Sequence, residues 1–190
     1  MKRIILFASG SGSNAENMIT YFRNSIEIEV SAVFTNKNTA PVIDRCKRLD
    51  IPVIYFNKTA FSGSKVILDF LESQKPDLIV LAGFLLKIPT NFITAFPNKI
   101  VNIHPALLPK YGGKGMYGTK VHEAVKENKE LETGITIHFV NENYDEGAII
   151  YQVKMPISTA DTIAKIAEKV HELEYEHFPK VLEKLLLTNG

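Results

Sequence analysis

Residues 100–105 end a strand-like segment on two side chains that can do chemistry. Asn102 and His104 lie two positions apart among strand-forming residues, so in an extended chain they point to the same side. Pro105 cannot continue the hydrogen-bonding ladder, and the strand must stop directly after His104. A carboxamide N–H and an imidazole offered together can stabilise the negative oxygen of a tetrahedral intermediate. The alternative is a strand end with two satisfied polar groups.

The segment ASGSGSN, residues 8–14, is predicted to bind an anion. It follows an apolar run and opens a helix, so its glycines allow close backbone approach and the helix N-terminus offers N–H groups. Gly10, Gly12 and Ala15 also fit a loose dinucleotide fingerprint. That fingerprint expects an acidic residue after the second strand, where this chain has Thr-Asn-Lys at 35–37. A mononucleotide or sugar phosphate therefore fits better than a nicotinamide dinucleotide, and a tight turn without a ligand is the alternative.

A third candidate is Asp145, in the turn-rich segment NENYDEG. The local pattern does not rank Asp145 above Glu142 or Glu146. Aspartate is common in turns, so Asp145 fits a purely structural role as well as it fits a partner for histidine.

The remaining histidines give weaker signals. His138 lies on a predicted strand and can face either the crevice or the core. Three others lie on predicted helices, where we expect them to be solvated: His122, His171 and His177. No two histidines show a metal-binding spacing, so no catalytic metal is predicted.

The composition is that of an ordinary globular protein. The chain has 190 residues, of which 45% are hydrophobic and 23% charged, and this length suits one domain. The formal net charge of +1 argues against a general nucleic-acid or membrane surface. The single cysteine, Cys46, cannot form an intrachain disulfide. No apolar stretch reaches the roughly 18 residues that span a membrane, and we expect a cytoplasmic protein.

Buried-strand patterns alternate with helical patterns along the first half of the chain. Strands are expected at residues 3–8, 27–36, 51–57, 76–83 and 98–104. Helices are expected at residues 14–24, 41–50, 64–75 and 89–96. This alternation predicts an α/β fold with a doubly wound, mostly parallel sheet. Ligands bind beyond the carboxyl ends of such strands, so the 8–14 turn and the Asn102–His104 pair should face one crevice.

The second half changes pattern. A helix is expected at 119–129, and strands at 133–142 and 147–157 form an antiparallel hairpin extension that completes a sheet of about seven strands. A long helix from about residue 159 to 187 closes the chain, with Thr159 or Asp161 as its cap. No linker separates the halves.

We therefore predict one domain, 1–190, with a nucleotide-binding half at 1–100 and a catalytic half at 101–190. The loop from His104 to Gly118 is long for a compact domain, and loops of that length are more often functional than not.

The motifs and their order resemble those of a known family. Besides the final helix, four segments carry the resemblance: SGSGSN (9–14), LAGF (81–84), NIHPALLPKYGG (102–113) and HFVNENYDEGAII (138–150). Over nearly its whole length the chain is similar to the phosphoribosylglycinamide formyltransferases, folate-dependent transferases of purine synthesis. NIHP-x-LLP in particular is similar to the signature of formyltransferases that use 10-formyltetrahydrofolate.

This resemblance implies a reaction, two substrates and three groups of site residues. It implies transfer of a formyl group from the co-substrate 10-formyltetrahydrofolate to the amine of glycinamide ribonucleotide, by a monomer or homodimer. The implied catalytic residues are Asn102, His104 and Asp145. The implied ribonucleotide contacts are Gly12, Ser13 and Asn14 for the phosphate and Glu174 for the ribose hydroxyls. The implied folate contacts are Leu85, Leu86, Lys87, Ile88 and Asn102. The resemblance also implies that the catalytic half, residues 101–190, takes part in folate binding.

Two positions depart from the family pattern. Leu86 stands where family members often carry arginine, and a second arginine is missing near Ser64–Lys65. The loop YGGKGMYG, residues 111–118, also differs from the more usual histidine-bearing loop.

The implied mechanism is acid–base assisted formyl transfer. Asp145 beside His104 is expected to favour the imidazolium and raise its pKa, so that the ring can protonate the departing folate nitrogen. The same core with water as acceptor would make a 10-formyltetrahydrofolate hydrolase, an enzyme that usually carries an extra N-terminal domain. A methionyl-tRNA formyltransferase would need an added basic C-terminal domain.

Two alternatives lie outside folate chemistry. The glycine turn favours a nicotinamide-dependent dehydrogenase, which Thr35 and Asn36 oppose. A non-catalytic nucleotide-binding module would have no use for Asn102, His104 and a distant aspartate together. Nucleic acid and membrane are not expected as partners.

Overall fold

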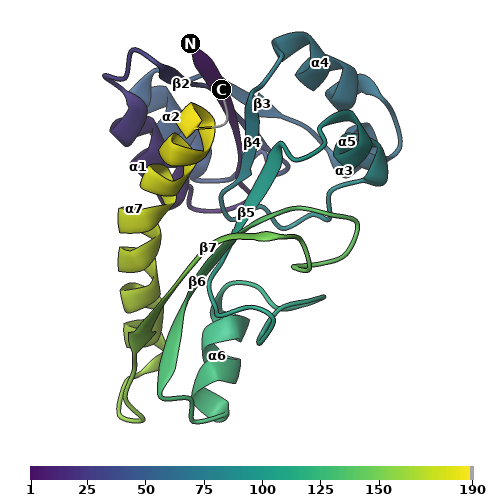
Figure 1. The fold of residues 1–190 in the computed structure, drawn as a ribbon. Helices are drawn as coiled ribbons and strands as arrows, with labels where there is room; N and C mark the ends of the chain where they lie inside the picture. The colour runs from purple at the N-terminus through teal and green to yellow at the C-terminus, as the bar shows by residue number, and fades with distance from the viewer. Residues whose placement is uncertain (189–190) are drawn as a thin grey trace.

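Strands from both halves of the chain form one continuous sheet (Figure 1). The computed structural model describes residues 1–188, and within them the sheet has seven strands in the order β3-β2-β1-β4-β5-β6-β7. The strands are β1 Lys2–Phe7, β2 Ile28–Thr35, β3 Val53–Tyr55, β4 Leu78–Leu81, β5 Ile100–His104, β6 Glu132–Phe139 and β7 Ile149–Pro156. Strands β1 to β5 pair in parallel, whereas β6 is antiparallel to both β5 and β7. The predicted mostly parallel α/β sheet with an antiparallel extension is confirmed.

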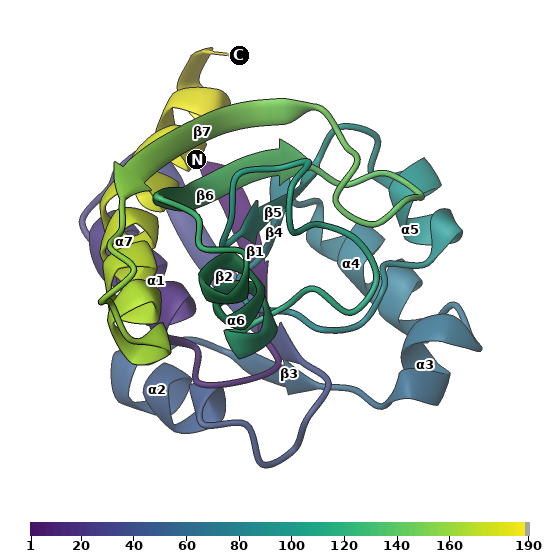
Figure 2. The ribbon, with the colours of Figure 1, turned by 90° about the horizontal axis from the view of Figure 1, so that it is seen from below.

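Helices cover both faces of this sheet. They are α1 Ser13–Phe22, α2 Val42–Leu49, α3 Lys58–Ser62, α4 Val66–Gln74, α5 Thr90–Ala95, α6 Thr119–Glu127 and α7 Ile163–Thr188. Helices α1, α2 and the long α7 lie on one side, and α3, α4 and α5 lie on the other (Figures 1 and 2). Helix α6 packs against α7. None of the helices within residues 1–188 combines the length and apolar character that crossing a membrane requires.

Alternating strand residues divide the hydrophobic core into two layers. Ile4 and Leu6 of β1 pack toward α1, α2 and α7, while Ile5 and Phe7 pack toward the opposite layer. This alternation follows from the two-residue period of a strand, and both sets are buried because helices cover both faces. Phe7 stacks on Phe34 with ring centroids 5.0 Å apart, in an aromatic cluster beneath α3 to α5.

Two local predictions need correction. Helix α3 was not expected; it is capped by Asn57, whose side-chain oxygen accepts a hydrogen bond from the Ala60 N–H at 2.8 Å. Thr159 or Asp161 as the cap of the last helix is wrong. Thr162 caps it instead, because its hydroxyl accepts from the Lys165 N–H at 3.1 Å.

The register between β5 and β6 positions the site. Asn102 pairs with His138 and His104 pairs with Thr136. Directly paired residues point to the same face of a sheet. Asn102, His104 and His138 therefore project together, near the carboxyl ends of β1 and β4.

Candidate active site

One cavity of about 440 Å³ lies beyond the carboxyl ends of the parallel strands. Its lining combines the 9–14 turn, the 81–88 segment, the end of β5, the 138–145 region and part of α7. The volume lies within the range of about 300–1,000 Å³ typical of small-molecule sites. The turn and the Asn102–His104 pair thus face one crevice, as the sequence predicted.

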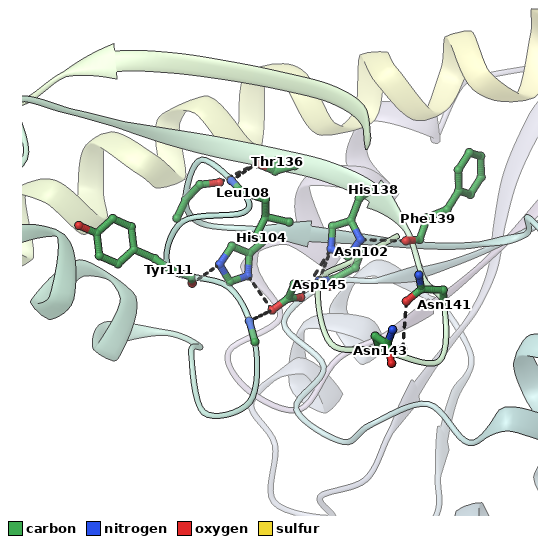
Figure 3. Close-up of polar contacts among 12 residues, drawn as sticks. Asn102, His104, Leu108, Tyr111, Thr136, His138, Phe139, Asn141, Asn143 and Asp145 are labelled. Carbon is green, nitrogen blue, oxygen red and sulfur yellow. Dashed lines mark hydrogen bonds and ion pairs between the residues drawn. The ribbon is translucent and has the colours of Figure 1, made fainter. Parts of the chain in front are cut away.

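His104 and Asp145 meet in this cavity (Figure 3). His104 Nδ1 lies 3.6 Å from Asp145 Oδ2, and the two side chains are 4% and 13% exposed. Of the three acidic residues in the 141–147 segment, Asp145 is the one turned inward, whereas Glu142 and Glu146 are exposed. The local pattern could not make this choice, because it depends on how the segment folds back over β5.

The loop after β5 holds both members of this pair. The Tyr111 carbonyl accepts a hydrogen bond from His104 Nε2 at 2.8 Å. The Gly113 N–H donates to Asp145 Oδ2 at 2.9 Å. The loop is tied to β6 where it begins, because Thr136 donates to the Ala106 carbonyl at 2.7 Å.

His138 links Asn102 to Asp145. Its Nδ1–H donates to the Phe139 carbonyl at 2.8 Å, so its Nε2 accepts from the Asn102 amide at 3.2 Å. Nε2 also lies 3.6 Å from Asp145 Oδ1. Of the two orientations that the sequence left open for His138, the structure has the one that faces the crevice, and the ring fixes the Asn102 carboxamide.

The expected rise in the pKa of His104 is wrong in its net direction. Burial lowers the pKa of His104 below its usual 6.5, and this effect exceeds the increase caused by the Asp145 carboxylate and the Tyr111 carbonyl. Burial raises the pKa of Asp145, but the His138 and His104 rings and the Gly113 N–H together hold it below 3.8. The pair therefore starts as a neutral ring beside an ionised carboxylate at neutral pH.

The 9–14 turn has the geometry of an anion cradle. Gly12 is the N-cap of α1 and lies in the left-handed region with φ of 73°. The first N–H groups of a helix have no intrahelical partner, so those of α1 are directed toward the turn. Arg45 fixes the turn from outside by donating to the Ser11 carbonyl at 2.8 Å.

The end of β2 is occupied by polar contacts within the protein. Asn36 Oδ1 accepts from the Ser9 hydroxyl at 2.6 Å. Ser9 in turn accepts from the Leu85 N–H at 3.0 Å. These contacts join the turn to the 81–88 segment, at the position where a dinucleotide site has an acidic residue.

Glu174 of α7 lies buried at the same end of the cavity. It is 4% exposed, and its Oε2 accepts from Asn14 Nδ2 and from His171 Nδ1, both at 2.8 Å. Glu174 raises the pKa of His171 by this hydrogen bond, although partial burial opposes the effect. Two residues implied by the resemblance for ribonucleotide binding, Asn14 and Glu174, are thus in direct contact.

His122 was expected to be solvated, and this is wrong. It is 4% exposed on the buried face of α6 and lines the cavity. Burial lowers its pKa, against a rise from Glu174. Within residues 1–188, His122 Nδ1 and Asn14 Oδ1 are buried without a hydrogen-bond partner. Such atoms are costly unless a ligand or water satisfies them, so this end of the cavity offers polar atoms with which a ligand can form hydrogen bonds.

The 85–88 segment lines the other side of the cavity with apolar groups. Leu85 is exposed, Leu86 is half-buried and Ile88 is buried. Lys87 Nζ lies 5.3 Å from the centroid of the Tyr144 ring, so a cation–π contact joins this segment to the one that carries Asp145.

Residues 1–188 contain no group of three or more His, Cys, Asp or Glu side chains placed to hold a metal ion. Cys46 is fully buried in α2, and burial raises its pKa to about 11. It packs as a small apolar residue.

The doubly wound sheet and the position of this candidate site agree with the comparisons to known proteins. The chain matches the Formyl transferase family model over residues 2–182, and it belongs to this family. A phosphoribosylglycinamide formyltransferase of Haemophilus influenzae is 37% identical over 188 residues, with 96% of this chain and 86% of that protein covered. The chloroplastic phosphoribosylglycinamide formyltransferase of Arabidopsis thaliana is 38% identical over 188 residues.

The coverage of these relatives differs. The alignment to the Arabidopsis protein includes 95% of this chain but 64% of the plant protein, so the chain spans less than two thirds of that relative. A crystal structure of phosphoribosylglycinamide formyltransferase from Streptococcus pneumoniae superimposes with a TM-score of 0.85 at 33% identity. That comparison covers 97% of this chain and 99% of the solved one.

Proposed function

We propose that this protein transfers the formyl group of 10-formyltetrahydrofolate to the amine of glycinamide ribonucleotide, a step of purine synthesis in the cytoplasm. The observation that carries the proposal is the position of Asp145, whose carboxylate lies 3.6 Å from both His104 and His138 beside Asn102. This constellation faces the same cavity as the 9–14 turn. Membership of the formyl transferase family supports the proposed reaction.

In this proposal the ribonucleotide lies between the turn and α7. Gly12, Ser13 and Asn14 bind the phosphate through the helix N-terminus, and Lys37 adds a positive charge to the same cavity. The buried Glu174 accepts hydrogen bonds from the ribose hydroxyls. Support comes from two buried atoms at this end that have no hydrogen-bond partner within residues 1–188, Asn14 Oδ1 and His122 Nδ1. A sugar hydroxyl can donate a hydrogen bond to the Asn14 oxygen, and it can donate to or accept from the His122 nitrogen.

The reduced folate is proposed to lie against Leu85, Leu86, Lys87 and Ile88, with its formyl group at Asn102. The apolar side chains suit a flat aromatic ring system, and the backbone of this segment can pair with its polar edge. Residues 1–100 and 101–188 both line the cavity, which supports a single domain whose halves act together.

The chain's residues then divide the chemistry among them. Asn102 uses one amide hydrogen on His138 and directs the other toward the formyl oxygen, where negative charge develops as the amine attacks. Loss of one such donor typically costs about 2.7–4 kcal/mol in barrier height. His104 and Asp145 receive the proton that the attacking amine releases, and His104 returns it to the departing folate nitrogen. One proton leaves the amine and one reaches the folate, so the step balances without a covalent enzyme intermediate.

The proposal is tested by assaying formyl transfer with His104→Ala and Asp145→Asn, next to Glu146→Gln as an exposed control in the same segment. We expect large losses of kcat in the first two and none in the control. Near-normal turnover in both site variants would overturn the proposed chemistry. Ser13→Ala should raise the ribonucleotide KM more than the folate KM, and the reverse ranking would mean that the turn is misassigned.

A further inference from the structure

Tyr111 adopts an unusual backbone conformation next to His104. Its φ of 58° lies in the left-handed region, which a bulky side chain rarely adopts unless the surroundings hold it there. In this conformation its carbonyl accepts the hydrogen bond from His104 Nε2 at 2.8 Å. The unusual conformation thus coincides with the contact that orients the ring.

The Tyr111 side chain is anchored away from the cavity. Its hydroxyl donates to Glu130 Oε1 at 2.8 Å, and Lys110 Nζ donates to the same oxygen at 2.9 Å. Hydrogen bonds from Lys110 and Tyr111 lower the pKa of Glu130, so the anchor is a carboxylate at neutral pH. Burial and Glu130 raise the pKa of Tyr111 to about 12, so the phenol keeps the proton that it donates. The ring also packs against the core.

Two acceptors compete for the proton of a neutral His104 ring. The Tyr111 carbonyl faces Nε2, and the Asp145 carboxylate faces Nδ1 at 3.6 Å. A carbonyl can only accept, so its short contact requires a proton on Nε2 and leaves the Nδ1 lone pair toward Asp145 and the cavity. Without the carbonyl, the negative charge of Asp145 would favour a proton on Nδ1 instead.

We propose that Tyr111, held by Glu130, is a positioning residue that keeps the proton of neutral His104 on Nε2 and so leaves Nδ1 free for proton transfer. The expected effect on kcat rests on the proposed function. The expected effect on the tautomer of the His104 ring concerns the ligand-free protein and does not depend on the reaction. Besides the Tyr111 carbonyl, four titratable groups interact with His104, and the test leaves all four in place: Asp145, His138, Glu174 and His122.

The test compares Tyr111→Phe and Glu130→Ala, each of which removes the anchoring hydrogen bond while leaving the backbone carbonyl in the chain. Glu130→Gln keeps an oxygen that can accept from the phenol, so it should restore the wild-type behaviour. Glu132→Ala is the matched control, because it removes a glutamate two positions further along the chain whose ion pair with Lys154 joins β6 to β7. Thermal unfolding of each variant establishes that it is folded.

The first readout is the ¹⁵N spectrum of His104 in the ligand-free protein at a pH where the ring is neutral. The wild type, Glu130→Gln and Glu132→Ala should show a proton on Nε2. Tyr111→Phe and Glu130→Ala should shift the population toward Nδ1. An unchanged Nε2 tautomer in both folded variants would overturn the proposal.

The second readout is kinetic. Both anchor variants should lower kcat by about tenfold, within the roughly 100-fold that misplacing a catalytic group can cause, with both KM values unchanged. The double variant should be no slower than the slower single variant, because the same Tyr111–Glu130 hydrogen bond is lost in all three. Losses that multiply would contradict the proposal. If the wild type transfers no formyl group at all, the proposed function fails, while the tautomer spectra still decide the positioning role.

Discussion

The Asp145 carboxylate lies 3.6 Å from Nδ1 of a His104 ring that is almost completely buried. His104 ends β5, and Asp145 lies in the segment between β6 and β7 that folds back over the same sheet edge. Burial lowers the pKa of the ring and the carboxylate raises it. The site thus holds an imidazole that is neutral before reaction and has a negative group ready to stabilise the charge it gains.

This arrangement predicts how His104 titrates. In the ligand-free protein its pKa should lie below 6.5, because burial outweighs the carboxylate. Asp145→Asn removes a group that raises the pKa, so the midpoint should move further down, whereas Glu146→Gln should leave it unchanged. NMR titration of the His104 ring measures all three midpoints. A midpoint above 6.5, or one that does not respond to Asp145→Asn, would contradict this account of the pair.

Gly12 should be irreplaceable within the 9–14 turn. A Cβ at this position would lie 2.3 Å from Val42 Cγ2, and the φ of 73° is unfavourable for any other residue. Gly12→Ala should therefore lower the free energy of unfolding. The left-handed backbone conformation should account for about 1–2 kcal/mol and the overpacking for about 1–3 kcal/mol. Gly10→Ala is the matched control, because nothing lies within 4 Å of a Cβ there. Urea unfolding compares the two, and equal stabilities would count against the tight contact between this turn and α2.

The sequence predicted those parts of the site that depend on neighbouring residues. The end of β5 could be located because Pro105 follows His104, and the glycine turn could be located because it separates an apolar run from a helix. The residues around them did not predict the contacts of His104 with Tyr111 and Asp145, since these depend on how two loops fold back over one strand end. The His104–Asp145 pair was expected only from the family resemblance.

The burial of His122 differs from these contacts, because it follows from residues close by in the sequence. It precedes Val125 by three positions, so both side chains lie on the same face of α6, and that face is buried. The helical spacing was therefore a usable signal. A helical histidine is solvated only when its face of the helix is exposed, and here that face lines the cavity.

His122 should make the stability of the protein sensitive to acid. Burial lowers its folded-state pKa below 6.5, so the unfolded chain binds the proton first and stability falls as the pH drops below 6.5. His122→Leu removes this proton uptake, and it also removes a buried nitrogen that has no hydrogen-bond partner within residues 1–188. Between about pH 7.5 and about pH 5.5 the variant should therefore lose less stability than the wild type. His171, whose raised pKa acts in the opposite direction, is common to both proteins. Urea unfolding at the two pH values measures the difference, and an equal loss in both proteins would contradict the prediction.

The Asn14–Glu174 contact should matter for both stability and ribonucleotide binding. Asn14→Ala removes one of the two hydrogen-bond donors to the Glu174 carboxylate, and Glu174 is 4% exposed. The loss of such a hydrogen bond typically lowers the free energy of unfolding by about 1.5–3 kcal/mol. The Michaelis constant for the ribonucleotide should rise while that for the folate stays unchanged, because the folate is expected at the 85–88 segment. Asn17→Ala provides the control: Asn17 also joins α1 to α7, donating to the Tyr175 carbonyl at 3.0 Å, but on the exposed surface. Thermal unfolding and steady-state kinetics compare the two variants. If Asn17→Ala were as damaging as Asn14→Ala in both measurements, the effect would belong to the packing of α1 on α7 and not to the buried carboxylate.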